Sequence, residues 1–206
     1  MIKKLLLALL LLFLVGCANK TTDKEFNTDL QIHEQIKKDL TNGALDKADN
    51  DFISLEANYP GSPYIKSDLL ALFLAHLQNQ DYILAKFYLN QYEKRFASIN
   101  EIPWCEYKKI KIEFLKYKNA YTNQTQILNI LNMCKTFQES YPNSEFLPEV
   151  NTIYIKAYLT KEYLDKKIAK LYKKLDKPKA ANFYNTKIPK NSQPPVIPWY
   201  KKLFYW

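Results

Sequence analysis

The chain has 206 residues, of which 47% are hydrophobic, and a formal net charge of +9 at pH 7. Only three glycines stand against sixteen tyrosines, which argues against glycine-rich strands and predicts an all-α fold of long helices. The lysines are scattered among glutamate and aspartate, so the charge indicates a solvated surface, and we expect no nucleic acid partner.

The first residues have the organisation of a lipoprotein signal peptide. Lys3 and Lys4 precede an apolar run over residues 5–13, which is too short to span a bilayer. The run closes on Leu-Val-Gly-Cys at residues 14–17, which resembles a bacterial lipobox. We therefore expect cleavage of residues 1–16 and a diacylglycerol and a fatty acyl chain on Cys17, with no other cofactor. A plain export signal or a buried apolar helix is the alternative.

Residues 17–24 are then a short lipidated tether. Ala18 follows the cysteine, and a non-acidic residue there resembles outer-membrane cargo in the sorting rule for lipoproteins of two-membrane bacteria. The chain is expected on the periplasmic face of the outer membrane, where acyl chains supply membrane residence without a transmembrane helix.

Residues 25–188 are predicted to form one helical domain. Apolar residues recur at helical spacing, and stop signals such as Thr41-Asn42-Gly43 separate the segments. Ser62 is predicted to cap the third helix, with Pro63 at its first position. The predicted helices cover residues 26–40, 44–59, 63–78, 82–96, 102–121, a segment through 130–141, a long region after 144 with a candidate break near Thr160, and 179–186.

The second and fourth helices repeat each other. A small residue, a large apolar residue and an aromatic residue recur 37 residues later, and a further shift of 45 places two apolar residues and an aromatic residue at the same positions. A period above 34 with these features predicts a tetratricopeptide-like right-handed superhelix of about four stacked hairpins. The three copies are Ala48, Phe52 and Tyr59, then Ala85, Leu89 and Phe96, then Ile130, Cys134 and Tyr141, and Gly43 maps to Gln80.

Cys105 and Cys134 are predicted to be two buried thiols. On consecutive antiparallel helices they would be about 7 Å out of register along the axis. Added to a helix separation of about 8–10 Å, this offset exceeds the reach of a disulfide.

Residues 189–206 have a different composition. Four prolines forbid a helix and predict an extended connector, which leads to an aromatic and basic segment over residues 199–206. This segment is expected to dock on a partner. The alternatives are a membrane surface and the chain's own peptide groove. The side chains expected to dock are Trp199, Tyr200, Phe204 and Trp206.

Four short motifs follow the lipobox in a fixed order: Tyr-Pro-Gly-Ser-Pro-Tyr at 59–64, Asn-Gln-Asp-Tyr at 79–82, Phe-x-x-x-Tyr-Pro-Asn-Ser at 137–144 and Ala-Ala-Asn at 180–182. In this order the motifs resemble the BamD (ComL) family of outer-membrane assembly lipoproteins. The resemblance covers about residues 24–188.

The resemblance implies a scaffold that binds the periplasmic POTRA domains of BamA, unfolded outer-membrane β-barrel precursors and other assembly lipoproteins. The chain departs from the family in two respects. The family has about five hairpins, and the arginines of its Tyr-x-x-Arg run are lysines here, Lys173 or Lys174. Another periplasmic repeat lipoprotein, an adaptor in cell division or peptidoglycan remodelling, is the alternative.

Arrays of this kind line a concave face with their first helices, which here offer aromatic and basic side chains. We expect the set to bind an extended peptide with aromatic residues. For any single member, ordinary packing between helices is the alternative. The set is Tyr64, Asp68, Phe73, Trp104, Tyr107 and Lys108.

Catalytic groups are scarce in this sequence. His33 and His76 are far apart, and each is better explained as a surface or core-edge residue of an amphipathic helix than as a metal ligand. Glu139-Ser140 resembles the Glu-Ser pair of lytic transglycosylases, but the repeat explains it, because it corresponds to Glu56-Ala57. We therefore predict that the protein is not an enzyme.

Overall fold

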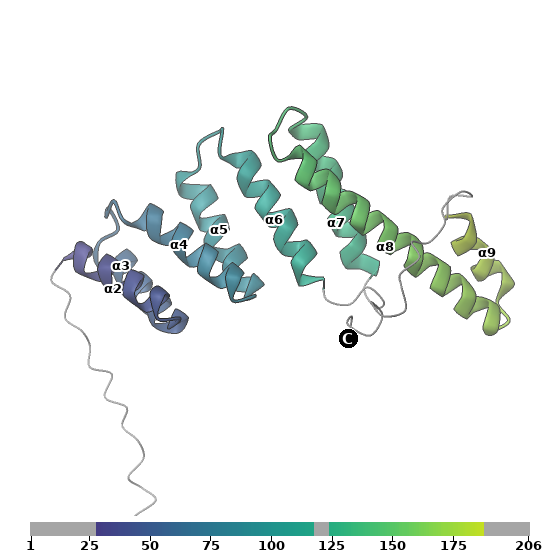
Figure 1. The fold of residues 1–206 in the computed structure, drawn as a ribbon, viewed down its shortest axis with the longest axis horizontal. Coiled ribbons are helices and arrows are strands. Elements are labelled where there is room, and N and C mark those ends of the chain that lie inside the picture. The colour runs from purple at the N-terminus through teal and green to yellow at the C-terminus, as the bar shows by residue number, and fades with distance from the viewer. Residues whose placement is uncertain (1–27, 118–123, 188–206) are drawn as a thin grey trace, which may run out of the picture.

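The structure is a computed structural model that describes residues 28–117 and 124–187. Within these residues the chain forms helices and no strand, so the predicted all-α class is confirmed. The helices follow one another along an elongated array from α2 to α9 (Figure 1). They are α2 (Asp29–Thr41), α3 (Leu45–Asn58), α4 (Ile65–Gln78), α5 (Tyr82–Phe96), α6 (Ile102–Lys116), α7 (Gln124–Ser140), α8 (Leu147–Lys174) and α9 (Pro178–Thr186).

The described helices pair into hairpins in chain order. Helix α2 packs on α3, α4 on α5, α6 on α7 and α8 on α9, and each hairpin also contacts the next. Successive first helices meet as well, since α2 touches α4 and α6 touches α8. This arrangement confirms the predicted tetratricopeptide-like array of about four hairpins. No helix in the described ranges is long and apolar enough to cross a membrane.

The turns inside three hairpins have the same backbone conformation. Gly43, Gln80 and Asp176 have positive φ angles of 71°, 63° and 53°. The next residue then donates its backbone N–H to a carbonyl five residues back, at 2.8–3.0 Å. Such a left-handed residue satisfies carbonyls left free at a helix end and reverses the chain. The sequence match of Gly43 to Gln80 therefore marks a real structural equivalence.

A buried alanine lies five residues after each of these turns. Ala48 and Ala85 are fully buried, and Ala181 is 5% exposed. A methyl side chain at this position lets the two helices of a hairpin approach closely, which explains its recurrence in the sequence. Ala181 extends the repeat to the fourth hairpin.

The predicted cap of the third helix is wrong. Helix α4 begins at Ile65, and its N-cap residue is Tyr64 in a helical conformation. Ser62 lies in the preceding turn, where its hydroxyl accepts a hydrogen bond from the Tyr64 N–H (3.3 Å) and donates one to the Asp29 carboxylate (2.9 Å). Pro63 therefore belongs to a turn that is tied back to α2.

Two further helix boundaries differ from the prediction. Helix α6 ends at Lys116 instead of 121, and residues 118–121 lie outside the described residues. Helix α8 is continuous through Thr160, whose hydroxyl donates to the Lys156 carbonyl at 2.8 Å. The rest of α8 after Pro148 contains neither proline nor glycine, so nothing interrupts its hydrogen-bond ladder.

The buried core has two parts that meet at α6. Cys105 and Ile112 pack with the residues of α2–α5, whereas Tyr107 and Ile110 pack with α7 and α8. Cys105 and Cys134 are buried and free, as predicted. Burial raises the pKa of the Cys105 thiol to about 12 and that of Cys134 to about 11, so both stay protonated at neutral pH.

Candidate partner-binding surface

We call the contact between the first helices of two successive hairpins a joint. The joint between α2 and α4 is a pair of stacked rings. The half-buried ring of Tyr64, the N-cap residue of α4, stacks on His33 of α2, with centroids 4.5 Å apart and an interplanar angle of 12°. His33 Nδ1 lies 2.6 Å from a carboxylate oxygen of Asp68. Burial raises the pKa of Asp68 to about 6, and the nearby histidine offsets part of this effect. Tyr64 is thus held in place by a buried polar pair.

Trp104 anchors a second cluster at the start of α6. Its indole packs edge-on against Phe73 of α4 at 5.8 Å and against Tyr92 of α5 at 6.2 Å. Lys108 places its Nζ over the rings of Trp104 (5.5 Å) and Tyr107 (5.2 Å), in cation–π geometry. Burial lowers the pKa of Lys108, and neighbouring Lys111 lowers it further. The cluster combines a half-buried indole with a desolvated cation.

The joint between α6 and α8 repeats the design of the first. Tyr107 stacks face to face on Phe146, the N-cap residue of α8, at 5.3 Å and 6°. In both joints the N-cap ring of one first helix lies on a ring of the preceding first helix. Sequence reasoning missed Phe146, although it follows Ser144 by two residues as Tyr64 follows Ser62.

The middle joint carries charge instead of a ring stack. Glu101, the N-cap residue of α6, accepts hydrogen bonds from the Tyr92 hydroxyl (2.6 Å) and the Ser98 N–H (2.8 Å). These bonds, led by that of Tyr92, lower the pKa of Glu101 to about 2, and Lys66 at 3.7 Å contributes. Lys66 also lies over the Tyr92 ring. Lys66, Tyr92 and Glu101 were not predicted, because no local pattern marks their meeting.

The two histidines of the described chain both pair with carboxylates. His33 is paired with Asp68, as described above. His76 is 2% exposed, and its Nε2 lies 2.9 Å from Asp49, which also accepts a hydrogen bond from the Tyr88 hydroxyl at 2.6 Å. His76 therefore belongs to the core, deeper than the core-edge position predicted for it.

The structure divides the predicted binding set into two clusters. Phe73, Trp104, Tyr107 and Lys108 form one, and Tyr64 and Asp68 join His33 in the other. Phe73 is fully buried and Asp68 is 1% exposed, so these two position their neighbours and present almost no surface themselves. Partner binding by the set stays a prediction. Cys17 and the tail residues Trp199, Tyr200, Phe204 and Trp206 lie outside the described residues.

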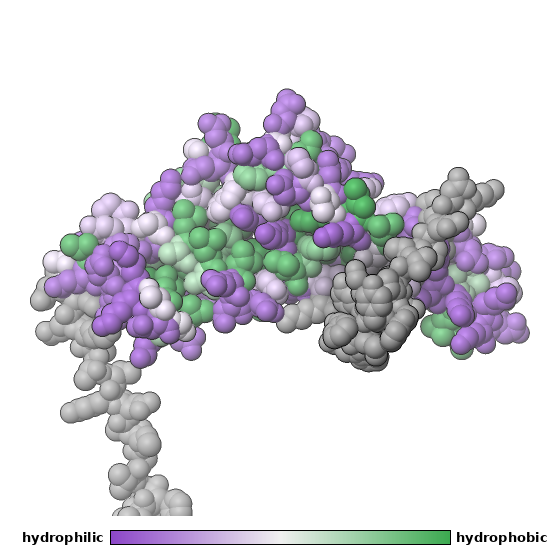
Figure 2. All heavy atoms as spheres, viewed as in Figure 1, coloured by the Kyte–Doolittle hydropathy of each residue, from purple (hydrophilic) through white to green (hydrophobic). Residues whose placement is uncertain are grey.

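The middle of the array carries apolar surface. Figure 2 shows hydrophobic residues gathered on the visible face over the region where α4, α5 and α6 lie in Figure 1. Stacked hairpins and ring joints between first helices together define a tetratricopeptide-like repeat protein.

Comparison with known proteins places this repeat protein in a family. Residues 26–188 match the family YfiO, described as outer membrane lipoprotein. The chain is 32% identical over 199 residues to the outer membrane protein assembly factor BamD of Helicobacter pylori (strain ATCC 700392 / 26695), an alignment that covers 93% of this chain and 90% of that protein. The chain therefore belongs to the BamD (YfiO) family of outer membrane lipoproteins. This membership confirms the resemblance and the outer-membrane location predicted from the sequence.

Proposed function

We propose that this protein is a non-enzymatic lipoprotein scaffold of the machinery that assembles β-barrel proteins into the outer membrane. The observation that carries the proposal is the match to BamD over nearly the whole of both chains, because it spans every hairpin of the array. The scaffold binds the periplasmic POTRA domains of BamA and receives unfolded barrel precursors. Other assembly lipoproteins are further candidate partners.

The two clusters on the first helices support precursor binding. Tyr64, Trp104 and Lys108 are half-buried, and their rings and cation are held by stacking on neighbouring side chains. Side chains that are ordered before binding lose little conformational entropy when a peptide docks. Aromatic and cationic groups on one face suit an extended peptide that carries aromatic residues.

Crosslinking to a peptide from the C-terminus of a barrel precursor tests this surface. The double variant Tyr64→Ala/Trp104→Ala is expected to weaken crosslinking at least about fivefold, since buried aromatic anchors are each worth 1 kcal/mol or more. The control Tyr82→Ala/Phe87→Ala removes two aromatic rings from α5 and should leave crosslinking unchanged. Equal crosslinking by the wild type and the Tyr64/Trp104 variant would show that the peptide binds elsewhere.

Binding to BamA needs a separate measurement. Pull-down of the full chain from detergent-solubilised envelopes is expected to recover BamA. Recovery of peptidoglycan-remodelling enzymes without BamA would instead indicate an adaptor of the cell wall or of division.

A further inference from the structure

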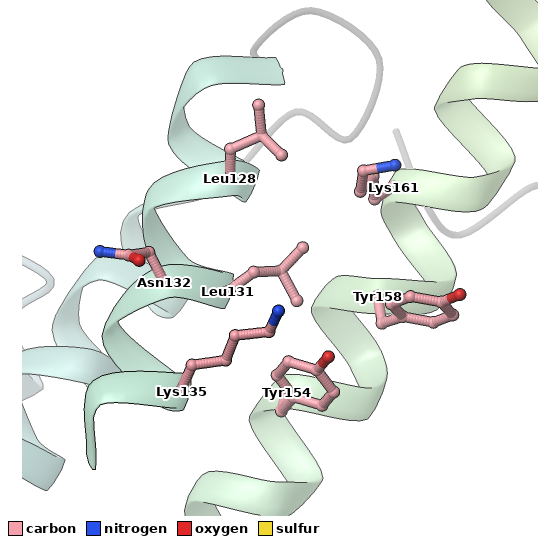
Figure 3. A pocket seen from close by; sticks show the side chains of 7 residues that line it. All are labelled: Leu128, Leu131, Asn132, Lys135, Tyr154, Tyr158 and Lys161. Carbon is pink, nitrogen blue, oxygen red and sulfur yellow. The ribbon is translucent and has the colours of Figure 1, made fainter. Parts of the chain in front are cut away.

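A hollow of about 280 Å³ opens between α7 and α8 (Figure 3). Leu128 and Leu131 of α7 face Tyr154 and Tyr158 of α8 across it, and Lys135 and Lys161 lie at its rim. Leu128 is 50% exposed, and the two tyrosine rings stack at 6.2 Å. The hollow thus offers an open apolar and aromatic wall with two lysines beside it.

An equivalent hollow of about 310 Å³ lies between α5 and α6, one hairpin earlier. The four α7 residues that line the later hollow each lie 45 residues after an α5 residue that lines the earlier one, and two α8 residues match two of α6 in the same way. The two hollows are therefore the same site in successive repeats. The matched residues are Ile83 and Leu128, Lys86 and Leu131, Phe87 and Asn132, Asn90 and Lys135, Glu113 and Tyr158, and Lys116 and Lys161.

The two hollows differ in what spans them. In the earlier one, Lys86 Nζ and Glu113 Oε1 form an ion pair of 2.6 Å between α5 and α6. Leu131 and Tyr158 occupy the same positions in the later hollow, so no ion pair can form there. The α7/α8 hollow has lost its polar bridge and is suited to apolar and aromatic groups.

This site is distinct from the first-helix clusters. Trp104 and Glu113 are nine residues apart on α6, and at 100° per residue they point in opposite directions. The hollows thus lie on the other side of the first helices from the proposed peptide surface. An occupant of the α7/α8 hollow leaves that surface free.

Helix α9 pairs with α8, the helix that forms one side of this hollow. It runs back along α8, where Tyr184 stacks on Tyr172 at 5.8 Å. Tyr158 lies fourteen residues before Tyr172, about 21 Å along α8. The proline-rich residues 188–198 can span up to about 34 Å as a polyproline helix. The aromatic segment after them is therefore within reach of the hollow.

We propose that the C-terminal segment, residues 199–206, docks in the α7/α8 hollow of its own chain. Six of its eight residues are apolar or aromatic, which matches a wall of two leucines and two tyrosines. Lys135 at the rim can lie against an aromatic ring of the segment. Tethering provides an effective concentration in the millimolar range, so even modest affinity keeps the hollow occupied. The docked segment covers apolar surface on the third and fourth hairpins.

Quenching of the tail tryptophans tests the proposal in the full chain reconstituted in lipid nanodiscs. Trp104→Phe leaves Trp199 and Trp206 as the only tryptophans, because the chain has three. A nitroxide is attached at Asn132→Cys in the α7/α8 hollow or, as the matched control, at Phe87→Cys in the α5/α6 hollow. Cys105 and Cys134 are buried and resist labelling, and Cys17 is expected to be acylated.

The label at position 132 is expected to reduce tail tryptophan emission at least twofold more than the label at position 87. Adding Leu128→Lys, an exposed substitution that keeps the core intact, should abolish this difference, because it places a third lysine at the hollow against the two lysines of the segment. Equal quenching from the two labels overturns the proposal, whether the tail is free, lies in the bilayer or binds elsewhere. Quenching that persists with Leu128→Lys overturns it as well.

Discussion

The buried carboxyl group of Asp68 is expected to make the stability of the protein depend on pH. Asp68 is 1% exposed, and burial raises its pKa from 3.8 to about 6 in the fold. The folded chain therefore binds more protons than the unfolded chain between these two values. The contribution of the Asp68 carboxyl group to the stability of the fold is fully present below pH 3.8 and is lost as the pH rises through 6.

The magnitude follows from the difference of about two pKa units. Each unit corresponds to about 1.4 kcal/mol, so the free energy of unfolding should fall by up to about 3 kcal/mol between pH 3.8 and pH 7 through the Asp68–His33 pair. Asp68→Asn keeps the shape of the side chain and cannot titrate. The variant should therefore gain up to about 3 kcal/mol relative to the wild type over the same interval.

Urea unfolding followed by helical circular dichroism, repeated from pH 4 to pH 7, measures this difference. Asp46→Asn is the matched control, because it makes the same change at an exposed residue in the first turn of α3, and it should change stability far less than Asp68→Asn does. His33→Phe keeps a ring on Tyr64 but removes the partner of the carboxylate, so it should raise the pKa of Asp68 further.

A constant stability difference between the wild type and Asp68→Asn across this range would refute the reasoning. It would mean that the carboxyl group of Asp68 has the same pKa in the folded and unfolded chains. The pKa is also measurable directly from the carbon-13 chemical shift of the Asp68 carboxyl group, which should report a midpoint near 6.

Two further substitutions test the packing and the turns. Phe137→Ala should lower the free energy of unfolding by about 3–5 kcal/mol in urea titrations, because the ring is 2% exposed in the α7/α8 core. Phe87→Ala, at a ring that is 49% exposed, should cost less than about 1 kcal/mol, and equal losses would contradict this account. Gln80→Gly should raise the melting temperature by relieving a left-handed backbone, a gain of roughly 0.5–1 kcal/mol, whereas Gly43→Gln should lower it. A lower melting temperature for Gln80→Gly would contradict the repeat equivalence of the two turns.

The sequence by itself determined the features that depend on local spacing. Helical periodicity and the recurrence of Ala48 as Ala85 specified a hairpin array, because a small residue lets the two helices of a hairpin approach closely. The match of Gly43 to Gln80 located two equivalent turns before any backbone angle was known. The lipobox motif and the order of the hairpin motifs are also patterns along one chain. They therefore pointed to the family without any tertiary structure.

The tertiary structure alone decided which side chains meet across hairpins. Periodicity marks the apolar stripe of a helix, but the rotation of one hairpin against the next settles what that stripe touches. The pairing of Asp68 with His33 and the stack of Tyr107 on Phe146 link residues 35 and 39 positions apart, and no local pattern records either contact. Asp68 and Phe73, which looked like a binding face in sequence, proved to be buried supports because the neighbouring first helices cover them.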